Sequence, residues 1–129
     1  MRGGQSLAEA LESYLAEWSE RTGIAVETWA LPATDVPSQV TRAVMATMDE
    51  ALSNVELHSR ARTVSIAVTV SKSGLRMTVS DNGQGFPAAG AGSGIARMRA
   101  SFAELGGSLS VNSVLGEGTT VTGVVPKRG

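Results

Sequence analysis

The chain has 129 residues, of which 42% are hydrophobic and 18% are charged, and its formal net charge is −1. This length and composition are typical of one globular domain with its own hydrophobic core. The near-neutral charge and the 4% of aromatic residues argue against nucleic acid or a membrane surface as a partner. With no cysteine and one histidine, the sequence excludes disulfides, thiol catalysis and a multi-histidine metal site.

The N-terminal part of the sequence predicts a helix followed by a short strand. Residues 1–5 are expected to form a flexible lead, and the domain itself is expected to occupy residues 6–129. A capping box at Ser6 opens the helix, apolar residues then recur at helical spacing, and Gly23 ends it. The strand is predicted over residues 24–31.

A second predicted helix, over about residues 36–59 with Asp35 as its N-cap, carries a line of polar residues. Glu50, Asn54 and His58 stand four residues apart and flank the apolar face, so they look into the cleft beside the neighbouring layer. A carboxylate and an amide one turn apart can share a hard cation such as Mg²⁺, directly or through water. A solvated polar stripe is the plainer alternative for these residues.

The second half of the sequence predicts four strands and one helix. Residues 63–71 alternate between apolar and polar, and a Ser-Gly turn leads into a strand over 75–80, so this pair is the clearest hairpin. A helix is predicted to begin at Gly94, with its apolar residues inward. Strands over 108–114 and 119–125 complete the pattern.

The order of these elements predicts the fold class. Helices and strands follow one another as α-β-α-β-β-α-β-β, which is not the strict alternation of a parallel doubly wound sheet. We therefore expect an α/β (α+β) two-layer sandwich. Its sheet should be mixed, mostly antiparallel and five-stranded, with the three helices packed on one face.

A carboxylate and two glycines follow directly on the strand over 75–80. Asp81 stands at the end of that strand, and Gly83 and Gly85 open the backbone beside it to a ligand. This carboxylate suits a planar heterocycle whose exocyclic amine donates a hydrogen bond. The alternative is an ordinary turn, since Asp-Asn-Gly is a common turn signal. Residues 82–92, rich in glycine and alanine, are predicted to form a mobile lid.

A second glycine cluster, Gly92-Ser93-Gly94, stands at the predicted start of the last helix. A glycine-rich helix N-terminus offers free N–H groups and the positive end of the helix dipole, which together favour an anion. A plain helix start is the alternative. The sequence lacks the Gly-Lys-Ser/Thr of a P-loop and an early Gly-x-Gly-x-x-Gly dinucleotide motif.

Four sequence boxes occur in order: residues 49–58, residues 81–86, residues 92–99, and Leu105-Gly106-Gly107 with Gly118-Thr119. Together they resemble the catalytic ATP-binding domain of bacterial sensor histidine kinases. These kinases share a superfamily, and its Bergerat-type ATP-binding fold, with DNA gyrase, Hsp90 and MutL. The resemblance covers nearly the whole chain, and Met98-Arg99 followed by the Leu105 box resembles the nitrate-sensor-like branch.

The resemblance implies a role for each matching residue. Asn54 would coordinate Mg²⁺, and Asp81 would accept a hydrogen bond from the adenine amine of ATP. Glu50 would be the catalytic, base-like group beside the phosphates and would reach the metal through water. The other residues of the implied nucleotide site are His58, Gly83, Gly85, Gly92, Ser93, Gly94, Ile95 and Thr119.

The resemblance also implies partners and leaves alternatives. The phosphoryl group would pass to a histidine on a separate dimerising helical domain and then to a response regulator. The domain would be cytoplasmic, within a parent kinase that can be membrane-anchored. Leu57 stands where the family often has Lys or Arg, a role for which Arg60 could substitute, and Ser93 replaces a larger residue. A free-standing anti-sigma-factor serine kinase or a catalytically silent regulatory module are the alternatives.

Overall fold

A computed structural model describes residues 6–32, 36–59, 61–83, 92–114, 116 and 118–126, with the backbone alone for residues 58, 59, 92, 93 and 114. The predicted flexible lead and most of the predicted lid, including Gly85, lie outside the described residues. The elements, in chain order, are α1 (Leu7–Thr22), β1 (Ala25–Ala30), α2 (Ser38–Asn54), the π-helical segment η1 (Val55–Ser59), β2 (Thr63–Ser71), β3 (Gly74–Asp81), α3 (Gly92–Ala103), β4 (Ser108–Val114) and β5 (Gly118–Pro126).

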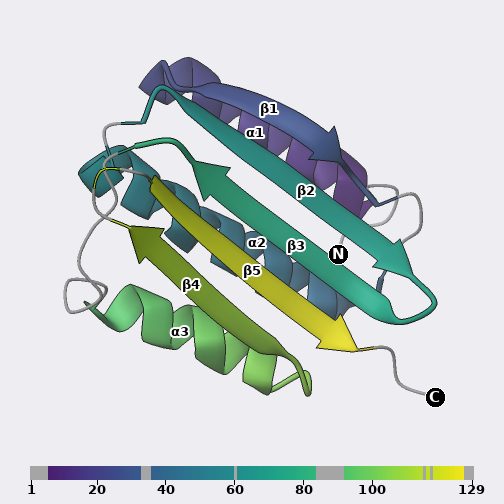
Figure 1. The fold of residues 1–129 in the computed structure, drawn as a ribbon. Helices are drawn as coiled ribbons and strands as arrows, with labels where there is room; N and C mark the ends of the chain where they lie inside the picture. The colour runs from purple at the N-terminus through teal and green to yellow at the C-terminus, as the bar shows by residue number, and fades with distance from the viewer. Residues whose placement is uncertain are drawn as a thin grey trace.

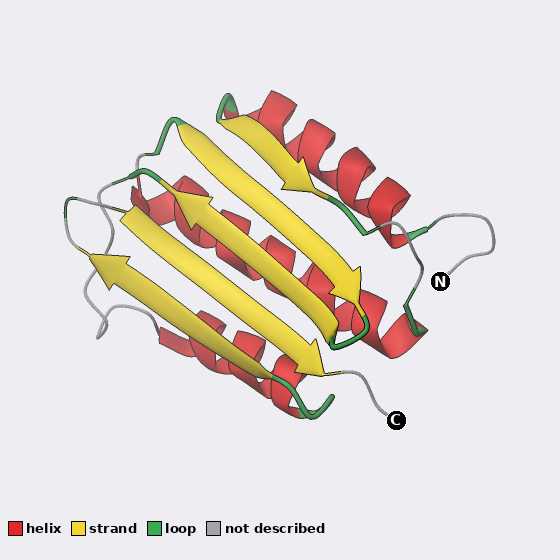
Figure 2. Ribbon diagram, turned by 45° about the vertical axis from the view of Figure 1, so that its right-hand side comes forward, coloured by secondary structure: helices red, strands yellow, loops and turns green. Residues whose placement is uncertain are grey.

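The strands form one mixed five-stranded sheet in the order β1-β2-β3-β5-β4. The pair β1–β2 is parallel, because α2 carries the chain back across the sheet between them, and the other three pairs are antiparallel. All three helices lie on one face of the sheet, with α1 behind β1 and β2 and α3 behind β4 and β5 (Figures 1 and 2). The predicted two-layer sandwich is therefore confirmed.

The core lies between the sheet and this helical layer. Along β2, Val64, Ile66 and Val68 are fully buried while the residues between them are only partly buried, which is the two-residue alternation of a strand with one covered face. The same alternation along β3 buries every second residue from Leu75 onward and ends at Asp81. The strand thus turns its last side chain, a carboxylate, toward the helices.

The first helix forms as its sequence predicts. The Ser6 amide donates to Glu9 Oε1 at 2.9 Å, and the Glu9 amide donates to Ser6 Oγ at 3.2 Å, which completes the capping box. Gly23 ends the helix with a φ of 78°, a left-handed conformation that glycine adopts without strain. No helix in the part of the chain that the structure describes is long and apolar enough to cross a membrane.

The second helix differs from its prediction at both ends. It begins at Ser38 with Pro37 at the N-cap position, so the prediction of Asp35 as N-cap was wrong. The reason is steric, because a proline disfavours helical geometry in the residue before it and so excludes Val36 from the helix. The α-helix also ends at Asn54, after which the chain continues as the π-helical segment η1.

Candidate functional site

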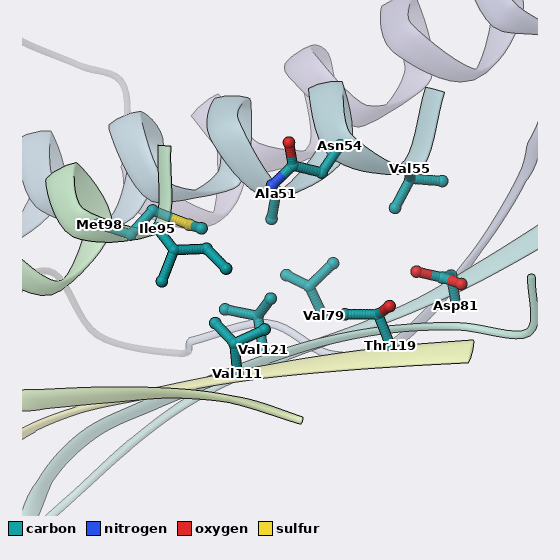
Figure 3. Close-up of a pocket in the computed structure, with 10 residues that line it drawn as sticks. All are labelled: Ala51, Asn54, Val55, Val79, Asp81, Ile95, Met98, Val111, Thr119 and Val121. Atoms are coloured by element: carbon teal, nitrogen blue, oxygen red, sulfur yellow. The ribbon is translucent and has the colours of Figure 1, made fainter. Parts of the chain in front are cut away.

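A narrow pocket opens between the helical layer and the sheet, at the end of β3 where Asp81 stands. Its empty space is about 320 Å³ with the open solvent at its mouth included. Apolar side chains make up most of its wall, and Asn54 on α2 lies across from Asp81 and Thr119 on the sheet (Figure 3). The lining residues are Ala51, Asn54, Val55, Val79, Asp81, Ile95, Met98, Val111, Thr119 and Val121.

Asp81 supplies a buried carboxylate to this pocket, with 8% of its surface exposed. The Gly83 amide donates to Asp81 Oδ1 at 2.8 Å, so the chain turns back on the carboxylate directly after the strand. Burial raises the pKa of the Asp81 carboxyl above its ordinary value, and backbone hydrogen bonds from Gly83 and Thr119 oppose part of that rise. The result is a desolvated hydrogen-bond acceptor at the end of an apolar slot.

Thr119 is held beside Asp81 by strand pairing and by a side-chain hydrogen bond. The two residues are partners in the β3–β5 ladder, and Thr119 is 7% exposed. Its Oγ1 lies 2.9 Å from Ser113 Oγ on β4, and either hydroxyl can be the donor. The structure therefore brings Thr119 and Asp81 side by side at one end of the pocket.

Gly118 makes the close approach of β5 to Asp81 possible. Its φ is 116°, and a Cβ on this residue would collide with the carbonyl oxygen of Asp81. The same Cβ would lie 3.3 Å from the Asn82 Cα, so backbone fills the space on that side too. The sequence shows a glycine next to Thr119, but it does not show that this glycine lies against the Asp81 backbone on the neighbouring strand.

The apolar walls of the pocket come from core residues. Ile95, at 6% exposure, and Met98, at 1%, extend from α3, while Val79 and Val121 rise from the sheet. Of these, the sequence assigned only Ile95 to the site. The apolar periodicity of the helix and the strands predicts that these side chains are buried. It does not show whether a buried side chain lies in the packed core or lines a pocket.

Glu50 lies on the same helix as Asn54 but faces α3. Arg97 Nε and Nη2 donate to Glu50 Oε1 at 3.2 and 2.5 Å. On the other side, a Cβ added to Gly94 would lie 2.7 Å from Glu50 Oε2. The Glu50 carboxylate is therefore enclosed by the first turns of α3, while Asn54 lines the pocket. Arg97 was not predicted, because nothing in its local sequence indicates a partner on another helix.

The remaining predicted site residues are only partly described. Gly92 is the first residue of α3, so the predicted helix N-terminus is present two residues earlier than expected. The α-helical line from Glu50 through Asn54 does not continue to His58, because the chain becomes π-helical at Val55. The side chains of His58 and Ser93, and all of Gly85 and Arg60, lie outside the described residues.

The arrangement fits a flat base that carries an amine and a negatively charged group. The mostly apolar walls of the slot suit an aromatic ring, and the desolvated Asp81 carboxylate can accept a hydrogen bond from an exocyclic amine. The N-terminus of α3 adds backbone N–H groups and the positive end of a helix dipole on the other side of the pocket. No cluster of three acidic or histidine side chains that could hold a metal occurs among the described residues.

Comparison with known proteins shows which family the chain belongs to. Residues 39–129 match the family described as histidine kinase-, DNA gyrase B- and HSP90-like ATPases. The chain is 34% identical over 126 residues to the sensor histidine kinase LiaS of Bacillus subtilis (strain 168), which covers 95% of this chain and 35% of LiaS. It is also 34% identical over 128 residues to the sensor histidine kinase MctS of Rhizobium johnstonii, covering 94% of this chain and 28% of MctS.

Solved structures agree with the sequence relatives. The histidine kinase domain of the blue-light activated histidine kinase from Erythrobacter litoralis EL346 superposes with a TM-score of 0.78 at 25% identity, over 94% of this chain and 61% of that one. The ATP-binding domain of PrrB from Mycobacterium tuberculosis shares the fold, with a TM-score of 0.70 at 20% identity over 97% and 96% of the two chains. The chain therefore belongs to the histidine kinase-, DNA gyrase B- and HSP90-like ATPase family.

Proposed function

We propose that this domain binds ATP with Mg²⁺ and supplies the γ-phosphoryl group to a histidine on a separate dimerising helical domain. From that histidine the group would pass to a response regulator. The observation that carries the proposal is the buried Asp81 carboxylate at the end of an apolar slot between α2, α3 and the sheet. Phosphoryl transfer depends more on positioning and charge neutralisation than on covalent chemistry by the protein, and such a slot supplies positioning.

We assign the residues around the slot as follows. The Asp81 carboxylate accepts a hydrogen bond from the adenine amine, with Gly83 and Thr119 fixing its orientation. The phosphates lie toward the N-terminus of α3. Asn54 is the protein ligand of Mg²⁺, which when bound offsets phosphate charge. Mg²⁺ is usually held by few protein ligands together with substrate phosphates, so a single amide ligand from the protein is consistent with this assignment.

The remainder of the proposal concerns the larger protein. The chain spans about a third of the length of the curated relatives it matches, 35% of LiaS and 28% of MctS. We propose that the phosphoacceptor histidine and the contact with the response regulator lie outside this domain, and that the domain acts on the cytoplasmic side. We also place it in the nitrate-sensor-like branch, on Met98-Arg99 followed by Leu105-Gly106-Gly107.

The proposal is tested by calorimetric titration with Mg²⁺-ATP and Mg²⁺-GTP. GTP should bind much more weakly, since guanine presents a carbonyl oxygen where adenine presents its amine. Asp81→Asn should weaken ATP binding by about 1.5–3 kcal/mol, the scale for a hydrogen bond to a charged group. Glu17→Gln removes an exposed carboxylate from α1 and is the matched control. Equal affinity for the two nucleotides, or unchanged ATP affinity in Asp81→Asn, would refute the assignment.

A transfer assay tests the second half of the proposal. The domain alone should bind ATP but produce little phosphoprotein, because the proposed acceptor is not part of it. Mixing it with the histidine-bearing helical domain of its own parent kinase should yield a phosphohistidine that is labile in acid. If a serine or threonine of an added protein is labelled instead, the acceptor assignment is wrong and the serine kinase alternative is supported.

A further inference from the structure

An ion pair ties α2 to α3 beside the pocket. Both Nε and Nη2 of Arg97 donate to the same oxygen of Glu50, at 3.2 and 2.5 Å, which is the geometry of a strong charge-assisted contact. The Glu50 side chain is 25% exposed and the Arg97 side chain 63% exposed. The Glu50 carboxylate is therefore largely shielded from solvent by protein. The ion pair Arg21–Glu56 is longer, at 3.6 Å, and its carboxylate is more exposed, at 38%.

The position of this pair connects it to the nucleotide site. Glu50 directly precedes Ala51, and Arg97 directly precedes Met98, and both of those following residues line the pocket. The second oxygen of Glu50 lies against Gly94, where a Cβ would approach it to 2.7 Å. The Glu50 carboxylate therefore sits at the first turns of α3, the end of the pocket to which the phosphates are assigned.

A carboxylate at that end opposes the binding of a triphosphate. Like charges a few ångströms apart repel, and the repulsion grows where protein excludes water. A guanidinium in direct contact cancels most of the carboxylate charge and also fixes where its oxygens lie. The contact holds Glu50 against α3 and away from the pocket lining to which Asn54 belongs.

We propose that Arg97 is a positioning residue for the phosphates of ATP, which acts through Glu50 by neutralising its charge and holding its carboxylate against the first turns of α3. This inference rests on the proposed function, because it assumes that phosphates bind at this end of the pocket. Arg97 should therefore affect the affinity for ATP but not the affinity for adenosine, which lacks phosphates.

The test is a double-mutant cycle on the isolated domain, with ATP and adenosine titrated by calorimetry in the absence of Mg²⁺. Arg97→Ala should weaken ATP about fivefold, the upper end for a partly exposed charge pair, and leave adenosine unchanged. Adding Glu50→Gln to Arg97→Ala should restore ATP affinity, because the uncompensated carboxylate is then gone. The loss in Arg97→Ala should also shrink at high ionic strength.

Two further variants separate positioning from general effects. Arg97→Lys keeps the cation and should retain most of the ATP affinity, whereas Arg99→Ala removes an exposed arginine from the same helix and should change nothing. Equal weakening of ATP and adenosine by Arg97→Ala, or no recovery in the double variant, would overturn the inference. A wild-type domain that binds no ATP would instead refute the proposed function, so the two failures are distinguishable.

Discussion

At the scale of single residues, Asp81 combines two properties that oppose each other. Its burial makes the carboxylate a strong and selective acceptor in the pocket, and the same burial raises its pKa, because the charged form has lost water. Backbone amides of Gly83 and Thr119 recover part of this cost. The residue is therefore placed for binding at some expense to the folded state, as is common for polar groups in functional sites.

The expense predicts how Asp81→Asn changes stability with pH. The pKa of the Asp81 carboxyl is higher in the folded protein than in the unfolded chain, so folding favours its protonated form. The resulting stability is fully present at pH values below the unfolded-state pKa, and it is lost as the pH rises through the folded-state pKa. Asparagine keeps the shape and an oxygen for the Gly83 amide without the charge. We expect Asp81→Asn to raise Tm at pH 7 and to show no gain below about pH 3.5, under the ordinary aspartate pKa.

Thermal unfolding followed by circular dichroism across this pH range measures the effect. Glu17→Gln, which removes an exposed carboxylate from α1, serves as the control and should leave Tm nearly unchanged at every pH. A lower Tm for Asp81→Asn at neutral pH would mean that hydrogen bonds to the carboxylate outweigh its desolvation in the folded protein.

Asn54 carries a separate prediction, which concerns the metal. Its side chain lines the pocket, so its amide group is available to a ligand. Asn54→Ala should weaken Mg²⁺-ATP by about tenfold, the scale for losing a group that supports a metal, and weaken metal-free ATP much less. Gln39→Ala removes an exposed amide from the same helix as control. An equal loss with and without Mg²⁺ would remove Asn54 from the metal site.

At the scale of elements, local sequence patterns predicted most of the strands. They did not predict where a helix changes its geometry or which residues distant in the sequence make contact. The strands Thr63–Ser71 and Ser108–Val114 have the predicted bounds, because alternation and turn residues specify a strand locally. The π-helical segment Val55–Ser59 has no such signal, since its hydrophobic pattern also fits an α-helix. The Arg97–Glu50 contact joins residues 47 positions apart, which no local pattern specifies.

The pairing of β3 with β5 gives an element-scale prediction. A Cβ at Gly118 would collide with the Asp81 carbonyl, so Gly118→Ala must separate the two strands at the site or strain the backbone. We expect a loss of more than about 1 kcal/mol in stability, together with weaker ATP binding. Gly116→Ala is the matched control, because Gly116 also has positive φ, 83°, but open space around its Cβ.

Denaturant titration of the two variants decides this point. If Gly118→Ala and Gly116→Ala lose the same stability and both keep wild-type ATP affinity, then the positive φ alone matters and the close approach to Asp81 does not. A larger loss of stability in Gly118→Ala would instead show that β3 and β5 can approach each other at the pocket only because residue 118 has no side chain.

At the scale of the whole molecule, the core extends beyond the segment that matches the family. The family model begins at residue 39, after α1 and β1. Yet α1 contributes four side chains that are between 0% and 4% exposed, and β1 extends the sheet in parallel with β2. Tyr14 Oη of α1 also donates to Asp49 Oδ1 on α2 at 2.7 Å. The four buried side chains of α1 belong to the same hydrophobic cluster as the apolar walls of the pocket.

A chain that lacks residues 1–30 should therefore fail to fold, although it retains every residue of the proposed site. The four buried side chains of α1 are Leu7, Leu11, Leu15 and Trp18. Deleting a buried side chain of this size costs about 2–5 kcal/mol, so losing four costs roughly 8–20 kcal/mol, which is as large as the ~5–15 kcal/mol that stabilises a typical domain. We expect no cooperative thermal transition and no ATP binding in the shortened chain. A chain that lacks only residues 1–5 keeps the Ser6 capping box and should melt like the wild type. If the chain without residues 1–30 still unfolds cooperatively, then residues 39–129 form a stable core on their own and α1 and β1 are not required for it.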